Sequence, residues 1–247
     1  MRYHDQPVAL VTGANRGIGR AVARQLAARG VTTVVGSRNL DAGQAVADEL
    51  APTGASVCAV RLDVTEEGSP AAVISQVGER FGRLDILVNN AGRTVEADAV
   101  DTTADDLRAV FDTNVVGPAD MTRTALALLR RSTSPRIVNV SSTTGSLTLT
   151  SGGTDFGGDA DRRLAYSTSK AALNMLTVQY HRAFQRDPSL RHVKINSATP
   201  GYTATDMNQG RGTRTVEQGA RIIVELALLP EDGPSGGFFN DQGPVAW

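Results

Sequence analysis

The sequence has few of the features that mark several common classes of protein. Its 247 residues include a single cysteine, Cys58, so no disulfide can form within the chain. Aromatic residues make up 4% of the chain, and the formal net charge is −1. A nearly neutral chain of mixed charges gives no electrostatic reason to bind nucleic acid. We therefore expect no nucleic-acid partner, and a core built mainly from aliphatic side chains.

Long apolar runs are also missing. No stretch approaches the ~20 apolar residues that a membrane-spanning helix needs. The N-terminus shows no secretory signal, because no long apolar segment follows its basic start. Cys58 lies in an alternating run and is expected to be a small buried hydrophobic residue rather than a nucleophile. These absences predict a cytoplasmic protein with no membrane partner.

What the sequence does contain is a repeated order of apolar runs and helix-length amphipathic stretches. Such alternation is typical of a parallel sheet covered on both sides. We predict an α/β fold with a Rossmann-type doubly wound parallel sheet of about seven strands and helices on both faces. No linker divides the chain, so residues 1–247 should form a single domain, with long loops near 143–165 and 201–215. Strands are expected at 7–13, 32–38, 55–64, 84–92, 135–142, 191–201 and 236–240, and helices at 18–30, 40–51, 71–82, 103–131, 166–184 and 216–229.

A glycine-rich turn, "TGANRGIG", follows the first expected strand. Glycines there let the backbone approach a diphosphate, and the amides that begin the next helix favour an anion. The spacing differs from the usual Gly-x-Gly-x-x-Gly, and a plain strand-to-helix turn is the alternative interpretation. The place of the turn in a repeated strand–helix chain favours a dinucleotide site. Its candidate residues are Gly13, Asn15, Arg16, Gly17, Ile18 and Gly19.

The end of the second expected strand, "VVGSRN", indicates which dinucleotide binds. An acidic residue there usually meets a free ribose 2′-hydroxyl, but this chain has Ser37 and Arg38. Arg38 and Arg16 suit a 2′-phosphate, which guanidinium groups bind through charge-assisted bonds. The alternative is that Arg38 is one of 23 arginines on a solvated surface, and a helix cap explains the nearby Asp41. We predict NADP(H) rather than NAD(H).

Seven short motifs follow one another along the chain. They are "TGANRGIG", "LDV" at 62–64, "NNAG" at 89–92, Asn114 in "FDTNVVG", "VNVSS" ending at Ser142, "YSTSK", and "PGYTATDM" from Pro200. In this order they resemble the motifs of the short-chain dehydrogenase/reductase family over nearly the whole chain. The resemblance implies an NAD(P)-dependent oxidoreductase.

The motif "YSTSK" holds Tyr166 and Lys170, and Lys170 is one of only two lysines in the chain. Residues four apart lie on one face of a helix, so the two side chains should project together. A free tyrosine has a pKa of about 10, and a nearby ammonium would stabilise the phenolate and lower that pKa. A compact ammonium on a slim stem suits this position better than the planar fork of an arginine. The pattern predicts Tyr166 as an acid–base group tuned by Lys170.

The family resemblance implies the remaining catalytic roles. Ser142, with Ser141 as its rival, would hydrogen-bond the substrate carbonyl. Tyr166 would donate a proton in reduction or remove one in oxidation. Lys170 would bind the nicotinamide ribose, and Asn114 would hold a water that links Lys170 to solvent.

The same resemblance places further residues around the cofactor, beside Tyr166 and Lys170. Asp63 and Val64 would flank the adenine. No metal is expected, because the three histidines are scattered along the chain. The residues implied to line the adenosine ribose are Asn90, Ala91 and Gly92, and those implied to enclose the nicotinamide are Pro200, Gly201, Thr203 and Thr205.

The chain departs from the usual family pattern between Ser142 and Tyr166, where 23 residues intervene. This insertion and the C-terminal ending resemble the carbonyl reductase branch, which implies NADPH-dependent reduction of aldehydes, ketones or quinones. The insertion is expected to cover the helix faces through which many family members pair, which favours a monomer over a homo-oligomer. The residues that either contact substrate or only order a surface loop are Phe156, Arg162, Arg163, Leu164, Tyr202 and Met207.

The sequence therefore predicts an NADPH-dependent carbonyl reductase that acts on a small molecule, with Tyr166 as the general acid. Two alternatives stay open. One is an NADP-dependent alcohol dehydrogenase that works in the oxidative direction, and the other is a non-catalytic NADP-sensing protein. The presence of Ser142, Tyr166, Lys170 and Asn114 argues against the sensor.

Overall fold

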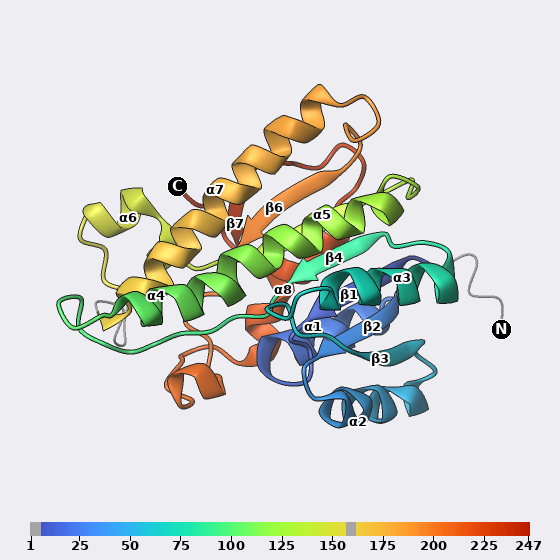
Figure 1. Ribbon diagram of the computed structural model, residues 1–247, viewed down its shortest axis with the longest axis horizontal. Coiled ribbons are helices and arrows are strands. Elements are labelled where there is room, and N and C mark those ends of the chain that lie inside the picture. Colours follow the sequence, from blue (N-terminus) through green and yellow to red (C-terminus); the bar gives the residue numbers. More distant parts are fainter. Residues whose placement is uncertain (1–5, 157–161) are drawn as a thin grey trace.

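The computed structural model describes residues 6–156 and 162–247, which surround one central sheet (Figure 1). The sheet has eight strands in the order β3-β2-β1-β4-β5-β6-β7-β8. The first seven pair in parallel, as the alternating pattern predicted. The strands are β1 Val8–Thr12, β2 Thr32–Ser37, β3 Val57–Arg61, β4 Ile86–Asn89, β5 Arg136–Val140, β6 Lys194–Ala198, β7 Phe238–Asn240 and β8 Gly243–Pro244.

The last strand was not anticipated. β8 pairs antiparallel with β7, and the two are joined by a tight turn. Asn240 accepts a hydrogen bond from the Gln242 amide at 2.9 Å within that turn. Gly243 follows with a φ of 126°, a backbone conformation that favours glycine. A two-residue strand of this kind leaves no periodic pattern in the sequence.

Helices cover both faces of the sheet, which confirms the doubly wound architecture. The aliphatic core is split accordingly: Val22 and Ile223 belong to the cluster on one face, and Val77, Met121 and Phe184 to the cluster on the other. The first face carries α1 Gly17–Ala27, α2 Leu40–Leu50 and α8 Val216–Ala227, and the second carries α3 Ser69–Phe81, α5 Gly117–Leu129 and α7 Leu164–Arg186. Shorter segments are η2 Ala51–Thr53, α4 Ala104–Phe111, η3 Asp112–Val116, η4 Thr143–Gly145, α6 Leu147–Ser151 and η6 Asp206–Asn208.

The single helix expected at 103–131 is divided into three segments. α4 begins after Thr103, which forms a capping box with Asp106. The π-helical turn η3 follows and leads directly into α5. Pro118 lies in the first turn of α5 and has no amide hydrogen, so the usual α-helical bond to the carbonyl of Asn114 cannot form. This missing donor favours the wider turn that contains Asn114.

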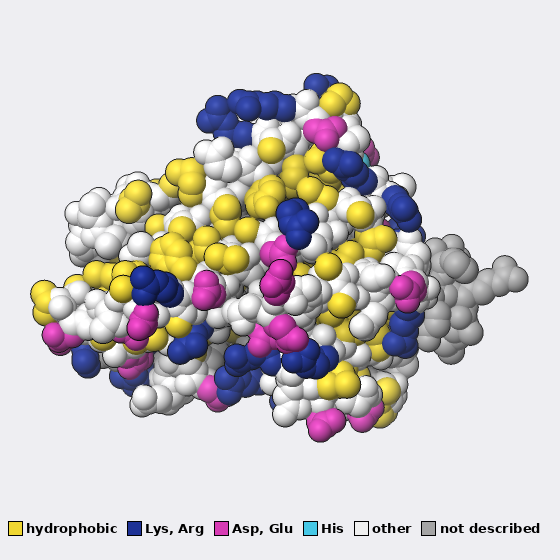
Figure 2. Space-filling view, in the orientation of Figure 1, with side chains coloured by type: hydrophobic (Ala, Val, Ile, Leu, Met, Phe, Trp, Pro, Cys, Tyr) yellow, Lys and Arg dark blue, Asp and Glu magenta, His cyan; other side chains and the backbone are white. Residues whose placement is uncertain are grey.

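The exposed faces of α5 and α7 test the expectation that the insertion covers them and so favours a monomer. Figure 2 shows hydrophobic side chains gathered over α5 and α7, and Val116 and Met175 are each 57% exposed. In Figure 1, α6 of the insertion lies towards the N-terminal end of α7 and leaves most of α5 and α7 uncovered. The described part of the insertion therefore does not cover these helix faces, and the oligomeric state stays a prediction.

Within the described residues, none of the helices has the length and hydropathy needed to cross a membrane.

Candidate active site

The motifs meet at one edge of the sheet. The glycine turn, the "NNAG" segment, Ser142 and Pro200 follow the carboxyl ends of β1, β4, β5 and β6, which are neighbouring strands. The chain order runs outward from β1 in one direction and from β4 in the other, so the strand order reverses between them. Ligands of open parallel sheets bind at such a reversal, outside the carboxyl ends of the strands.

The glycine turn packs directly against "NNAG". Gly13 and Gly17 have φ values of 62° and 55°, in the left-handed region that favours glycine. A Cβ at Gly13 would lie 2.9 Å from the Cα of Ala91, and one at Gly19 would collide with the side-chain amide of Asn90. The side chain of Arg16, the N-cap residue of α1, makes no capping hydrogen bond to the first turn of that helix. The amides that begin α1 are therefore available to an anion such as a diphosphate.

Thr12 has a role that the sequence analysis did not assign. Its hydroxyl accepts hydrogen bonds from the amides of Asn90 at 3.0 Å and Ala91 at 2.9 Å. The Asn90 side chain in turn donates to the carbonyls of Thr12 at 2.8 Å and Gly13 at 3.1 Å. These bonds fasten the glycine turn to the end of β4. The signal was the position of Thr12 at a strand end, but its partner is known only once β1 and β4 are paired.

The residues expected at the 2′-phosphate lie near the end of β2. Arg38 is exposed, whereas Ser37 is buried and donates its hydroxyl hydrogen to the carbonyl of Asn39 at 2.7 Å. Arg16 pairs with Asp206 of the 201–215 loop at 3.0 Å, so it already spans the gap between that loop and the glycine turn. Both guanidinium groups are accessible to a phosphate, while the Ser37 hydroxyl hydrogen is engaged.

Asp63 and Val64, which the family resemblance places beside the adenine, have different surroundings. Burial raises the pKa of Asp63, but hydrogen bonds from Thr65 and the charges of Arg38 and Arg61 outweigh it and hold that pKa below its usual value. Asp63 therefore stays ionised beside Arg38. Val64 packs against Gly117, where an added Cβ would lie 2.9 Å from the Cβ of Val64. The Val64 side chain lines a separate open cleft beside α5.

A cleft at the carboxyl ends of β5 and β6 gathers most of the remaining candidates. Ser142 and Tyr166 both line it, and so does Ile18 of the glycine turn. Ser141, the rival of Ser142, is buried and directs its hydroxyl to the carbonyl of Lys170 at 3.4 Å. Arg162 and Leu164 are not among the lining residues. The cleft is completed by Thr143, Thr144, Phe156, Arg163, Pro200, Gly201, Tyr202, Thr203, Thr205, Met207 and Asn208.

Tyr166 and Lys170 are neighbours, as their spacing predicted. The Lys170 ammonium lies 5.4 Å from the centre of the Tyr166 ring and donates to the carbonyl of Val140 at 2.7 Å. Burial lowers the pKa of Lys170 to about 8. Burial raises the pKa of Tyr166, and the hydrogen bond with Ser142 and the charge of Arg163 offset this only in part. The expected lowering of the Tyr166 pKa by Lys170 is therefore wrong for this structure, because desolvation outweighs the nearby charges.

Asn114 acts on the start of α7. Its buried side-chain amide donates to the carbonyl of Arg93 and to the hydroxyl of Ser169, both at 2.9 Å, and its oxygen accepts from the Arg93 amide at 2.8 Å. Ser169 then donates to the carbonyl of Tyr166 at 2.6 Å. Asn114 thus fixes the turn that carries Tyr166, and the implied water link to Lys170 stays a prediction.

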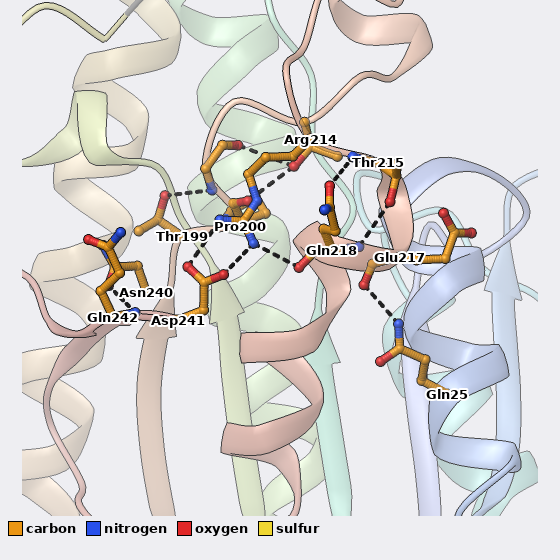
Figure 3. A network of polar contacts seen from close by, with 12 residues as sticks. Gln25, Thr199, Pro200, Arg214, Thr215, Glu217, Gln218, Asn240, Asp241 and Gln242 are labelled. Carbon is orange, nitrogen blue, oxygen red and sulfur yellow. Dashed lines mark hydrogen bonds and ion pairs between the residues drawn. The ribbon is translucent and has the colours of Figure 1, made fainter.

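The loop at 201–215 is closed by Arg214, which the sequence analysis missed (Figure 3). The Ala204 amide donates to the Arg214 carbonyl at 2.8 Å, and the Arg214 amide to the Tyr202 carbonyl at 3.0 Å. The Arg214 guanidinium binds the carboxylate of Asp241, in the turn between β7 and β8, and the carbonyl of Gln218. This contact joins parts of the chain that no local pattern connects, and Arg214 is one of 23 arginines. It holds one wall of the cleft against the sheet.

Within residues 6–156 and 162–247, no group of three or more His, Cys, Asp or Glu side chains is placed to hold a metal ion. The described chemistry therefore consists of hydroxyl, ammonium, guanidinium and amide groups around a cleft. This set suits proton donation to an oxygen and the binding of a phosphorylated ligand.

Comparisons with known proteins agree with this geometry. The family model described as short chain dehydrogenase matches residues 7–215. The chain is 35% identical to (−)-isopiperitenone reductase of Mentha piperita, and the alignment covers 98% of each chain. The structure of NADPH-bound carbonyl reductase from chicken fatty liver superimposes with a TM-score of 0.83 at 30% identity, covering 98% of this chain and 99% of that chain. Salutaridine reductase of Papaver somniferum gives 0.81 at 28% identity, covering 96% and 100%. The chain therefore belongs to the short-chain dehydrogenase family.

Proposed function

We propose that the protein is an NADPH-dependent reductase that converts the carbonyl group of a small molecule to an alcohol. The observation that carries this proposal is that Ser142 and Tyr166 line one cleft while Lys170 lies buried against the Tyr166 ring. Two hydroxyl donors facing one cleft are suited to a carbonyl oxygen that gains negative charge during reaction.

The protonation state of Tyr166 fits the role of general acid in reduction. Burial raises the pKa of its phenol, so the hydroxyl is protonated at neutral pH. A general acid in reduction must begin in this form, whereas oxidation of an alcohol needs the phenolate. We propose that Tyr166 gives its proton to the carbonyl oxygen while Ser142 donates a hydrogen bond to the same atom. Tyr166 therefore begins in the form that the reductive step uses, while the net direction depends on the cellular ratio of NADPH to NADP.

The first βα turn fits a dinucleotide. Gly13 and Gly19 let the turn pack closely against the "NNAG" segment, and the start of α1, which the Arg16 side chain does not cap, offers amide donors. When bound, NADPH supplies the hydride. Arg38 and Arg16 are proposed to hold the 2′-phosphate, with Arg16 exchanging Asp206 for it. The chicken carbonyl reductase, which is NADPH-bound, supports this preference.

The other candidate residues keep the roles that the family resemblance implies. Lys170 is proposed to bind the nicotinamide ribose, and Asn114 to support Lys170 through a water. The protein is further proposed to act in the cytoplasm, and because the faces of α5 and α7 are uncovered, a homo-oligomer stands beside the monomer as a proposal. The residues proposed to surround the cofactor beyond the glycine turn are Ser37, Asp63, Val64, Asn90, Ala91, Gly92, Pro200, Gly201, Thr203 and Thr205.

The test is the rate of cofactor consumption with a panel of aldehydes, ketones and quinones, with NADPH and NADH measured in parallel. We expect turnover on at least one carbonyl class and a preference for NADPH of about tenfold or more, since two guanidinium groups face the 2′-phosphate. Equal rates with NADH would contradict the cofactor assignment. Tight NADPH binding without turnover of any carbonyl, or of alcohols with NADP, would favour the sensor.

A further inference from the structure

The sequence left Arg163 as a residue that either contacts substrate or orders a surface loop, and the structure places it on the cleft of the reacting groups. It is the last residue before α7 and precedes Tyr166 by less than one helical turn. Its side chain is only 12% exposed and lines the same cleft as Ser142 and Tyr166. Its positive charge lowers the pKa of the Tyr166 phenol and so offsets part of the increase that burial causes. Arg163 is therefore placed to contact whatever occupies the cleft.

One tip of the Arg163 guanidinium is fixed from outside the cleft. Its Nη2 donates to the Oε1 atom of Glu96 at 2.7 Å. The backbone is held as well, because Ala97 bridges to Arg163 and donates its amide hydrogen to the Arg162 carbonyl at 3.0 Å. Arg211 of the 201–215 loop approaches the same Glu96 oxygen at 3.5 Å. The orientation of Arg163 is thus set by its ion pair with Glu96 and by the backbone bridge to Ala97.

The Nε–H group of Arg163 donates no hydrogen bond within the described residues. The Nε atom is buried and has no hydrogen-bond partner within residues 6–156 and 162–247. Buried donors in folded proteins are nearly always paired, so an unpaired one on a residue that lines a cleft can take a bound oxygen as its partner. The Nε of Arg214 is also unpaired, but Arg214 does not line the cleft and packs against Gly201. Among the unpaired buried side-chain donors of the described residues, the one on a residue that lines the cleft with Ser142 and Tyr166 belongs to Arg163.

We propose that Arg163 is a specificity-determining residue whose Nε–H binds a second oxygen of the substrate, adjacent to the carbonyl that is reduced. This inference rests on the proposed reductase function. Ser142 and Tyr166 take the reacting oxygen, and Arg163 takes the other. The preferred substrates are then carbonyl compounds that carry a neighbouring carbonyl, hydroxyl or ether oxygen.

The test compares two ketones that differ by one oxygen, phenylacetone and the corresponding α-diketone, phenylpropanedione. Arg163→Met should lower the ratio of kcat/KM for the diketone to kcat/KM for phenylacetone by about tenfold or more, because only the diketone loses a charge-assisted hydrogen bond. The loss of the charge beside Tyr166 acts on both ketones alike and cancels in this ratio. Arg163→Lys keeps a positive charge beside Tyr166 and a partner for Glu96, and should show the same selective loss. Arg162→Met is the matched control, since Arg162 pairs with Asp98 away from the cleft and should leave both ketones unchanged.

Equal losses on both ketones, or no loss on either, would overturn the role of Arg163. Calorimetric binding of the two ketones, with and without NADP, gives a readout that needs no turnover. Arg163→Met should weaken diketone binding by about tenfold and leave phenylacetone binding unchanged. If the wild-type protein reduces neither ketone, the proposed function fails for this class of compound, and the binding comparison still decides the role of Arg163.

Discussion

Lys170 shows how burial sets the chemistry of a single residue. The ammonium is enclosed beside the Tyr166 ring and donates to the Val140 carbonyl. Desolvation disfavours the charged form and lowers the pKa of Lys170 to about 8. Lys170 is therefore charged below that pH and becomes neutral above it. Any role that uses the ammonium is lost on the alkaline side.

We expect kcat/KM for NADPH to fall as the pH rises through about 8, because the free enzyme then loses the Lys170 proton. The measurement is a profile of initial rates at low NADPH from about pH 6 to pH 10. Lys170→Met should be slow at every pH and should lack this alkaline step. A wild-type profile that stays level to about pH 10 would contradict the role of the ammonium.

The sequence predicts some features of the pair of Tyr166 and Lys170 and misses others. Four-residue spacing on a helix predicts that the two side chains are neighbours, and the structure confirms it. The direction of the Tyr166 pKa was predicted wrongly, because it depends on how much water the surrounding segments exclude. Those segments come from distant parts of the chain, so helical spacing carries no information about them.

The segment η4 presents Ser142 to the cleft, and it depends on close contact with α7. Ser142 is the N-cap of η4 and accepts a hydrogen bond from the Thr144 amide. Gly145, at the end of η4, approaches the helix so closely that an added Cβ would lie 2.7 Å from both the carbonyl carbon and the Cβ of Lys170. The relative position of Ser142 and Tyr166 therefore depends on the absence of a side chain at Gly145.

Gly145→Ala should lower the free energy of unfolding by about 1–3 kcal/mol, since the methyl group must push η4 away from backbone atoms of α7. Turnover should fall as Ser142 moves. The measurement is denaturant unfolding of the variant beside Gly78→Ala, where the added Cβ meets only the flexible Leu128 side chain at 3.3 Å. Gly78→Ala should be neutral or slightly stabilising. Equal stabilities for the two variants would refute the close contact.

Two elements show where prediction from sequence stops. Amphipathic periodicity predicted one helix at 103–131, and the π-helical turn at Asn114 follows from the missing amide of Pro118, a signal present in the sequence but not used. The closure of the 201–215 loop by Arg214 and Asp241 left no such signal. Their bond joins the loop to a turn 27 residues away, and only the pairing of β6 with β7 brings them together.

On the scale of the whole molecule, the order of the elements determines where the chemistry lies. Parallel strands place their carboxyl ends at the same edge, so motifs scattered from residue 12 to residue 205 meet there. The alternating pattern predicts this architecture because each strand and helix leaves its own local signal. The insertion leaves no such signal for its place in the fold, and its described part does not give the expected covering of α5 and α7 (Figures 1 and 2).

The central claim is that Tyr166 protonates a carbonyl oxygen during NADPH-dependent reduction. The most direct test compares Tyr166→Phe with the wild-type protein, measuring turnover of the best carbonyl substrate and the Kd for NADPH. Phenylalanine keeps the ring that lies beside Lys170 and removes only the hydroxyl. We predict a fall in kcat of about a hundredfold or more, with the Kd for NADPH changed by less than about threefold. A variant that keeps more than about a tenth of the wild-type rate would contradict the account.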